Sequence, residues 1–302
     1  MKKALIIYNP SAGVSTRNDV GALTINYLHK LGFETDLFYL NSDFEKNIAD
    51  YDFSHVKLVV AIGGDGTVKV AGRTIIQNKL NIPLAIIPFG SANVVASSLH
   101  IPLNIKQALK LIGGNKEQRI DLGLINNSRY FVVGLSQGYI SEVVTGTSAK
   151  LKNRLGFFGY IINFIFSNAR IKRTKYKIES NGKTFWLKGN SLVIFNACNF
   201  HGFKARKNIS ITDGLLNLYV ITNKSLWNFI KSGIYLVFFR ERTKLLFNFD
   251  GKEFKITLKN KSNSFQIDGD KIDLPRIIDV KILPKVLSVY SGHTDAKAMA
   301  GK

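Results

Sequence analysis

The stretch that decides the fold runs from residue 57 to residue 69 and reads Lys-Leu-Val-Val-Ala-Ile-Gly-Gly-Asp-Gly-Thr-Val-Lys. Its apolar part, residues 58–62, is typical of a strand buried on both faces of a parallel sheet. The three glycines that follow allow positive φ angles and let backbone N–H groups approach an anion closely. A helix expected from residue 68 adds the partial positive charge of its N-terminus. The stretch therefore predicts a strand, a phosphate-binding loop and a helix, against the plainer alternative of a tight turn with Asp65 as a helix cap.

Two further loops have the same character. Residues 9–13 (Asn-Pro-Ser-Ala-Gly) follow an expected strand at 4–8, and residues 88–93 (Pro-Phe-Gly-Ser-Ala-Asn) follow one at 84–87. The carboxyl ends of neighbouring parallel strands meet at one edge of a sheet, where open α/β sheets bind ligands, so the three loops are expected to converge there. This convergence predicts a nucleotide site. The sequence contains neither a Walker nor a Rossmann glycine motif, so the site belongs to neither class.

The order of the predicted elements divides the chain into two domains. In residues 1–122, alternating strands and helices predict a doubly wound α/β domain with parallel strands. The helices expected there are 18–31, 45–51, 68–78, 92–99 and 105–112, and the strands are 4–8, 35–40, 57–62 and 84–87. In residues 123–284, strands separated by Asn-Gly and Asp-Gly turns predict an antiparallel β domain. The strands expected there are 130–135, 174–180, 184–187, 191–196, 215–221, 252–259, 264–267 and 277–282. The last segment, residues 285–302, is assigned to neither domain, and the prediction allows it to pack against the first domain.

The composition narrows the classes of binding partner and the cellular compartment that we expect for this protein. The 302 residues include 42 Lys and Arg against 21 Asp and Glu, a formal net charge of +21. Such a charge favours acidic partners, namely nucleic acid, an anionic membrane surface or phosphates. The single cysteine, Cys198, excludes an intrachain disulfide framework and a multi-cysteine zinc site. A single cysteine is typical of proteins in the reducing cytosol. Because the sequence also contains no stretch long and apolar enough to predict a membrane span, we expect a cytoplasmic protein.

Two stretches, residues 155–166 and 226–239, combine large apolar residues with basic flanks. The basic neighbours are Lys150, Lys152, Arg154, Arg170, Lys172, Arg173, Arg240 and Arg242. Basic residues beside apolar ones suit peripheral binding to an anionic membrane surface, and we expect that association. The alternative is that the apolar faces cover the β domain while the charges are solvated.

Seven motifs, in their order and spacing, make the sequence similar to a known family. They are Asn9-Pro10-x-x-Gly13, Gly63-Gly64-Asp65-Gly66-Thr67, Pro88-x-Gly90-Ser91-Ala92-Asn93, Ile101-Pro102, Arg119-x-Asp121-Leu122-Gly123, Asp213-Gly214-Leu215-Leu216 and Asp268-Gly269-Asp270. Together they resemble the catalytic-domain family of diacylglycerol kinases, which includes soluble bacterial lipid kinases and the sphingosine kinases. The resemblance covers nearly the whole chain. It implies an N-terminal α/β nucleotide-binding domain, a C-terminal antiparallel β-sandwich for the lipid substrate, and an active site in the cleft between them.

The resemblance also implies the cofactors ATP and Mg²⁺ and a set of residues that contact ATP. Position 41 comes from a looser match, at the end of the second strand. The residues carried over are Asn9, Ser11, Ala12, Gly13, Asn41, Gly63, Gly64, Asp65, Gly66, Thr67, Val68, Lys69, Ser91 and Asn93.

Two Asp-Gly turns receive roles from the same resemblance. The turn Asp268-Gly269-Asp270 corresponds to the family's catalytic-base motif, so Asp270 or Asp268 is expected to accept a proton. Asp65 is expected to be a further catalytic carboxylate. The turn that begins at Asp213 corresponds to the family's structural Mg²⁺ loop, in which Asp213 and oxygens of Ser210 and Leu215 hold the ion. Oxygen ligands suit Mg²⁺. Taken alone, the turn at residues 268–270 is better explained as a hairpin turn, and the turn at residues 213–216 is equally well explained as an ordinary β-turn.

The resulting hypothesis is an ATP-dependent lipid kinase that transfers the γ-phosphate to a lipid hydroxyl of diacylglycerol, a sphingoid base or phosphatidylglycerol. Its expected partners are the membrane lipid and an anionic membrane surface, without nucleic acid, and homodimer formation is left open. One alternative is a soluble-metabolite kinase of the NAD-kinase type. Another is a basic membrane- or nucleic-acid-binding protein with weakened catalysis, because the family pattern is broken at Val14, Lys69, Val94 and Ser97.

Overall fold

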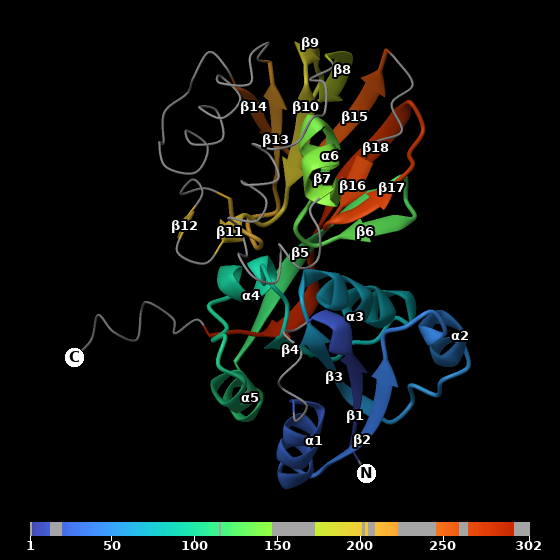
Figure 1. The fold of residues 1–302 in the computed structure, drawn as a ribbon, viewed down its shortest axis with the longest axis vertical. Helices are drawn as coiled ribbons and strands as arrows, with labels where there is room; N and C mark the ends of the chain where they lie inside the picture. The colour runs from blue at the N-terminus through green and yellow to red at the C-terminus, as the bar shows by residue number, and fades with distance from the viewer. Residues whose placement is uncertain are drawn as a thin grey trace, which may run out of the picture. The chain divides into compact units, whose positions relative to one another are not determined.

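The computed structural model describes residues 2–12, 20–114, 116–146, 173–200, 203–204, 209–222, 246–259 and 265–292. The chain forms two compact units (Figure 1). One comprises Met1–Ile120 with Leu287–Lys302, and the other comprises Asp121–Val286. The sequence analysis places the corresponding boundaries after residue 122 and at residue 285. Among the described residues, no helix has the length and hydrophobicity needed to cross a membrane.

The first unit is built on a parallel sheet in the order β2-β1-β3-β4. Its strands are β1 (Lys2–Tyr8), β2 (Phe33–Tyr39), β3 (Val56–Gly63) and β4 (Leu84–Pro88). The end of β18 (Ile277–Tyr290) joins the sheet in parallel beside β4, where Val289 pairs with Leu84. The middle residues of β1, β3 and β4 are fully buried, as the apolar runs predicted.

The strand ends are in register. Tyr8 lies opposite Tyr39 on one side and Ile62 on the other, and Gly63 lies opposite Pro88. The carboxyl ends of all four strands therefore meet at one edge of the sheet, and the loops that follow them start side by side.

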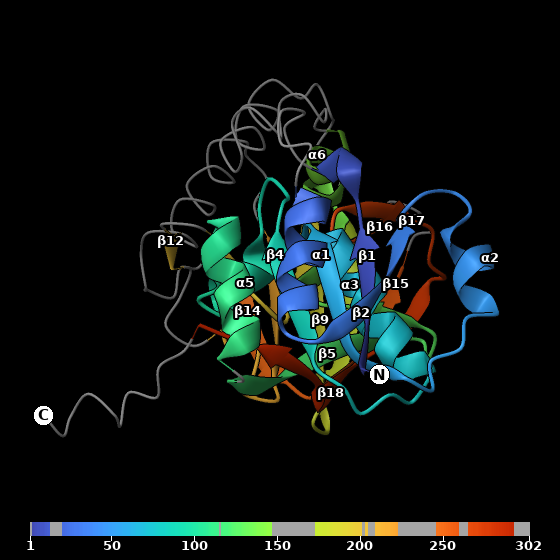
Figure 2. The same ribbon diagram turned by 90° about the horizontal axis from the view of Figure 1, so that it is seen from below.

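Among the described residues, a short 3-10 turn and three helices connect these strands, and two further helices follow β4. They are η1 (Pro10–Ala12), α1 (Val20–Lys30), α2 (Phe44–Ala49), α3 (Asp65–Gln77), α4 (Val94–Ser98) and α5 (Ile105–Gly113). Helices α1 and α5 contact each other, while α2 packs beside β2 at the other margin of the unit, as Figure 2 shows from below. Helix α5 begins at an Asn104 cap whose side chain accepts a hydrogen bond from the Gln107 N–H. The α/β class predicted for this part of the chain is confirmed.

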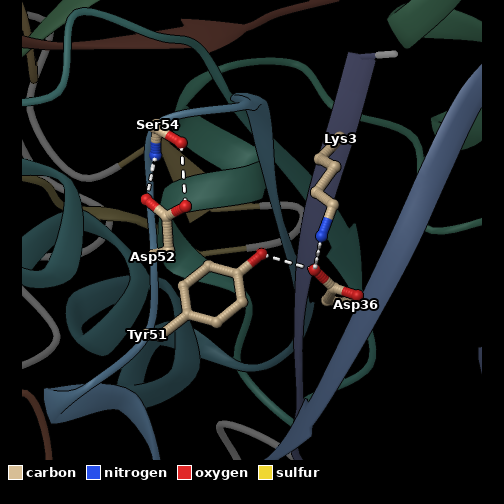
Figure 3. Close-up of polar contacts among 5 residues, drawn as sticks. All are labelled: Lys3, Asp36, Tyr51, Asp52 and Ser54. Atoms are coloured by element: carbon tan, nitrogen blue, oxygen red, sulfur yellow. Dashed lines mark hydrogen bonds and ion pairs between the residues drawn. The ribbon is translucent and has the colours of Figure 1, made fainter.

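A polar cluster on β2 ties the chain before β3 to the edge of the sheet (Figure 3). Asp36 Oδ2 accepts a hydrogen bond from the Tyr51 hydroxyl at 2.6 Å and pairs with Lys3 Nζ at 3.1 Å. Next to it, the Asp52 carboxylate accepts hydrogen bonds from the N–H and the hydroxyl of Ser54 and closes the turn before β3. The Tyr51 hydrogen bond and the Lys3 charge lower the pKa of the Asp36 carboxyl.

Replacing Asp36 with Asn removes the charge that pairs with Lys3, so it is expected to lower the free energy of unfolding at neutral pH. The expected loss is only about 1 kcal/mol, because the carboxylate is only partly buried. The folded-state pKa of Asp36 lies below its unfolded value, so the stabilisation is present above the unfolded pKa and is lost as the pH falls through the folded pKa. Urea unfolding of both proteins across the acidic range measures the difference. A difference that stays constant down to the most acidic pH would contradict the assignment.

Among the described residues, the second unit contains two large antiparallel sheets and one two-stranded antiparallel pair. One runs β14-β13-β10-β7-β16-β17 and comprises β14 (Leu246–Gly251), β13 (Leu216–Ile221), β10 (Ser191–Phe195), β7 (Gly134–Gly138), β16 (Phe265–Ile267) and β17 (Asp270–Ile272). The other runs from the first part of β18 through β15 (Glu253–Leu258) and β8 (Thr174–Ser180) to β9 (Lys183–Gly189). The remaining elements are β5 (Glu117–Ile125), β6 (Arg129–Phe131), α6 (Tyr139–Gly146), β11 (Asn199–Phe200) and β12 (Phe203–Lys204).

Side chains from both sheets share one apolar core. Ile178 and Phe254 enter it from the second sheet, and Leu218 and Phe265 enter it from the first. All four are at most 1% exposed. The antiparallel β class predicted for the C-terminal part of the chain is therefore confirmed.

One predicted strand is wrong. Residues 130–135 were expected to form a single strand, but β6 ends at Phe131 and β7 begins at Gly134 in the other sheet. The two residues between them donate their N–H groups to the Asp268 carboxylate instead of to a neighbouring strand. An apolar run does not reveal that its backbone hydrogen bonds go to a side chain far along the sequence.

Candidate functional site

Hydrogen bonds between strand ends and loops assemble one edge of the first unit. The Asn9 N–H donates to the Ile62 carbonyl at 2.9 Å, and the Phe89 N–H donates to the Gly63 carbonyl at 2.9 Å. The Leu40 N–H donates to the Tyr8 carbonyl at 2.8 Å. The structure thus brings together the loops at residues 9–12, 40–43, 63–67 and 89–93, which carry nearly all the predicted nucleotide contacts. Gly13 lies outside the described residues.

Two glycines let the central loops touch. A Cβ atom added to Gly90 would lie 2.4 Å from the Cα of Gly64, which is closer than real Cβ contacts allow. Asn93, at φ 47°, closes the second loop: its Oδ1 accepts from the Gly90 N–H at 3.0 Å, and its Nδ2 donates to the Gly90 carbonyl at 2.6 Å. Asn93 therefore shapes the loop with the same amide that the sequence analysis assigned to ATP.

Asp65 connects the starts of two helices. It is the first residue of α3, and its carboxylate accepts hydrogen bonds from the N–H groups of Val94 at 3.1 Å and Val95 at 2.9 Å, at the start of α4. Burial raises the pKa of the Asp65 carboxyl, and the backbone N–H donors partly oppose this shift. These contacts give Asp65 a positioning role between the two glycine loops.

Among the described residues of this edge, the hydroxyl of Thr67 is the group best suited to receive a hydrogen-bonding ligand. Its Oγ1 is buried and has no hydrogen-bond partner there. Such an atom is costly to leave unsatisfied. Thr67 lies in the first turn of α3, whose N-terminal dipole favours negative charge, so the residues present fit a phosphate group.

The outer loops offer exposed polar groups. Asn9 Oδ1 accepts from both the N–H and the hydroxyl of Ser11, at 3.1 and 2.7 Å, and holds the first turn. Asn41 Oδ1 similarly accepts from the Asp43 N–H at 3.1 Å. Ser91 is exposed at the tip of its loop. The other predicted contacts on this edge are Ala12, Gly63, Gly66, Val68 and Lys69, of which Val68 is buried in α3.

The sequence analysis missed an aromatic row beside these loops. The Tyr8 ring lies 5.8 Å from that of Tyr39 and 6.3 Å from that of Phe89, measured between centroids. Burial raises the pKa of Tyr8, and the neighbouring Tyr39 adds to the shift. The signal was present in the sequence, because Tyr8 ends the strand predicted at 4–8, Tyr39 is the last residue but one of the strand predicted at 35–40, and Phe89 comes shortly after the strand predicted at 84–87.

In the second unit, the structure separates the two acids of the predicted catalytic turn. Asp268 and Gly269 both have positive φ angles, 50° and 95°, and join β16 to β17 in a tight hairpin. The Asp268 carboxylate accepts from three successive N–H groups, those of residues 132–134, at 2.9–3.0 Å. Asp270 is the exposed first residue of β17. Asp268 therefore fastens the hairpin to the start of β7, while Asp270 stands at the surface.

The predicted metal residues share one turn of the second unit. Asp213 Oδ1 accepts from the Leu215 N–H at 2.9 Å, and the hydroxyl of Ser210 lies 3.0 Å from that of Thr212. Burial raises the pKa of Asp213, and the nearby Asp121 carboxylate raises it further. These side-chain and carbonyl oxygens suit Mg²⁺, although the described residues contain no group of three His, Cys, Asp or Glu able to hold a metal.

Asp121 is a buried acceptor, which the sequence analysis named in a motif but gave no role. It accepts from the Gly214 N–H at 2.6 Å and the Lys285 N–H at 2.7 Å, which joins the turn to β18. A cavity of about 410 Å³ opens here, lined by Asp121, Thr212, Asp213, Gly214, Lys252, Glu253, Lys281, Ile282, Pro284 and Lys285. Three lysines on its wall offset the acidic residues around the turn.

Comparison with known proteins adds to this geometry. The family described as the diacylglycerol kinase catalytic domain matches residues 3–125. A diacylglycerol kinase of Staphylococcus aureus (strain JH9) is 29% identical over 230 residues, which cover 74% of this chain and 72% of the relative. Two solved structures from Bacillus anthracis str. Sterne share the fold at 23% and 22% identity, with TM-scores of 0.80 and 0.77. The alignments cover 96% of this chain in both cases, and 95% and 97% of the solved chains.

Proposed function

We propose that this chain, whose residues 3–125 match the diacylglycerol kinase catalytic domain, is a lipid kinase that transfers the γ-phosphate of ATP to the hydroxyl of a membrane lipid. The observation that carries the nucleotide part is the contact of the two glycine loops beside the buried, unpartnered hydroxyl of Thr67. Diacylglycerol is the first acceptor to test, because the S. aureus relative is named for it.

The loops at the sheet edge would position the nucleotide. The Thr67 hydroxyl and the exposed hydroxyls of Ser11 and Ser91 are donors suited to phosphate oxygens. Asp65 supports this arrangement from behind, since it holds the start of α4 against the start of α3. Mg²⁺, when bound, supplies charge neutralisation for the phosphates.

Asp270 is the proton acceptor in this proposal. The lipid hydroxyl oxygen forms a bond to the γ-phosphorus, the bond from that phosphorus to the β–γ bridging oxygen breaks, and the hydroxyl proton passes to the Asp270 carboxylate. Exposure of Asp270 and the three backbone donors on Asp268 support this choice between the two acids. The Asp213 turn would hold a structural Mg²⁺ through oxygen ligands.

The test is transfer of labelled γ-phosphate from ATP to acceptors in mixed micelles, with and without Mg²⁺. The panel contains diacylglycerol, monoacylglycerol, a sphingoid base and phosphatidylglycerol, with NAD as a water-soluble acceptor. We expect labelled product from at least one lipid and none from NAD. Transfer to NAD alone would identify a soluble-metabolite kinase. ATP binding without transfer to any acceptor would identify a binding protein on a kinase fold.

A further inference from the structure

One face of the second unit is a sheet surface that no other described element covers. Strands β9, β8, β15 and the first part of β18 alternate along their length between core and outward side chains. Tyr176 and Ile178 of β8 are buried in the core, whereas their neighbour Lys175 is exposed. The register of each strand pair places the outward side chains in rows across the four strands. Figure 1 shows the four strands side by side.

Charge is distributed unevenly over these rows. At the end where β18 begins, one row is Trp186, Lys177, Thr257 and Ile277, and the next contains Lys188, Lys175 and, beyond β15, Lys259. At the other end the rows are Thr184, Glu179, Lys255 and Asp279, followed by Glu253 and Lys281. Three acids balance two lysines at the second end, while the outward side chains of the first two rows include no acid.

We call the first end the basic corner, defined as Lys175, Lys188, Lys259, Trp186 and Ile277. Its three lysines are exposed, and none of them forms an ion pair with a carboxylate among the described residues. Arg276 adds a charge at the same end, where its guanidinium donates to the carbonyls of Leu258 and Lys259. Lys177 is different, because it pairs with Glu179 at 2.9 Å.

Two large apolar side chains stand among these cations. Trp186 is 74% exposed and Ile277 is 51% exposed, both unusually high for their types. The Trp186 ring is steadied by Lys177, whose Nζ lies 5.9 Å from the ring centroid. An exposed tryptophan ringed by lysines matches the composition that settles at a membrane–water interface, where the ring enters the headgroup region and the ammonium groups meet lipid phosphates.

We propose that the basic corner docks this protein on an anionic lipid bilayer. A second copy of the chain is a poorer occupant, because a symmetric contact would press the same unbalanced lysines against each other. Nucleic acid would match the lysines, but it leaves the exposed Ile277 without a partner. The choice of lipid over nucleic acid rests on the proposed lipid kinase function.

The test is co-sedimentation of the full chain with vesicles of phosphatidylcholine alone and with vesicles of phosphatidylcholine and phosphatidylglycerol in equal parts. The double variant Lys188→Gln/Lys259→Gln is expected to bind the anionic vesicles about 30-fold more weakly, at about fivefold per lysine. Trp186→Ala is expected to weaken binding about tenfold. The matched control is Lys255→Gln/Lys281→Gln, which removes two lysines from the balanced end of the same face and should retain more of the binding.

Equal losses in the two double variants would overturn the proposal, because net charge alone would then explain binding. Equal binding of the wild type to both vesicles would also overturn it. Loss of binding to duplex DNA in the Lys188/Lys259 variant, with vesicle binding unchanged, would assign the corner to nucleic acid. A concentration-dependent dimer that Trp186→Ala abolishes, again with vesicle binding unchanged, would assign it to a second copy.

A second readout separates this inference from the proposed function. Phosphorylation of a short-chain diacylglycerol dissolved as monomers should be unchanged in the corner variants, while phosphorylation of the same headgroup in anionic vesicles should fall. Absence of transfer to any acceptor in the wild type would refute the proposed function without touching vesicle binding. Intact transfer with vesicle binding insensitive to the corner would refute the inference alone.

Discussion

Asp270→Asn is expected to lower kcat for lipid phosphorylation by about 1,000-fold. The amide keeps the size of the side chain but cannot take a proton at neutral pH, so the loss falls on the proton-transfer step. The dissociation constant for ATP should be unchanged, since Asp270 belongs to the hairpin of the second unit and not to the glycine loops. Steady-state transfer to diacylglycerol, with ATP binding measured by calorimetry, checks both parts. An unchanged kcat would contradict the role of Asp270.

The neighbouring acid supplies the control. Asp268→Asn should lower the free energy of unfolding by about 2 kcal/mol, because an amide nitrogen would replace one of the oxygens that accept three backbone N–H groups. Asp270→Asn should leave stability nearly unchanged, since its side chain is exposed. If Asp268→Asn kept full stability while kcat collapsed, the roles assigned to the two acids would have to be exchanged.

Gly90→Ala is expected to lower the free energy of unfolding by about 3 kcal/mol and to abolish measurable ATP binding. The new Cβ would lie 2.4 Å from the Gly64 Cα and 3.0 Å from Asn93 Oδ1, so the backbones of both loops must move apart. That movement would displace Thr67 and the hydrogen bonds by which Asn93 closes its loop. Denaturant unfolding and calorimetry with ATP measure the two effects.

Gly66→Ala is the matched control for stability. It adds the same methyl group to the same site, but an added Cβ at Gly66 has no atom within 4 Å among those compared. Because Gly66 lies within α3, the alanine should keep or slightly raise the free energy of unfolding, by up to about 1 kcal/mol. Equal destabilisation by the two substitutions would show that the contact between the loops is not what restricts Gly90.

Most of the first unit could be predicted from local patterns. The strands at 4–8, 57–62 and 84–87 were predicted by the apolar runs 4–8, 58–62 and 84–87, and each is a central strand of the observed sheet. The glycine loops were predicted because they follow those runs directly. Local patterns failed at residues 130–135, where one apolar run serves two different sheets. The chain changes sheets there because Asp268, distant in sequence, takes the backbone hydrogen bonds.

The roles of the candidate site residues were less predictable than their positions. Asp268 and Asp270 are equivalent in the sequence, and only the fold shows that one is held by backbone donors while the other is exposed. Asp65 likewise bonds to the N–H groups of Val94 and Val95, some thirty residues away along the chain. No local pattern encodes such pairs, because the acceptor and the donors meet only when two loops pack.

The sequence by itself determined the division into an α/β part and an antiparallel β part, the loops at the strand ends and the strong positive charge. Hydrophobic periodicity and turn residues can be read from short stretches, and the net charge is a sum over all residues. The tertiary structure alone decided which acid is exposed and which glycine bears the close contact. It also decided which lysines gather beside Trp186 and which are balanced by acids, since these come from four strands and 103 positions separate Thr174 from Ile277. Neighbourhood across a sheet depends on register, and register is set by long-range packing of the core.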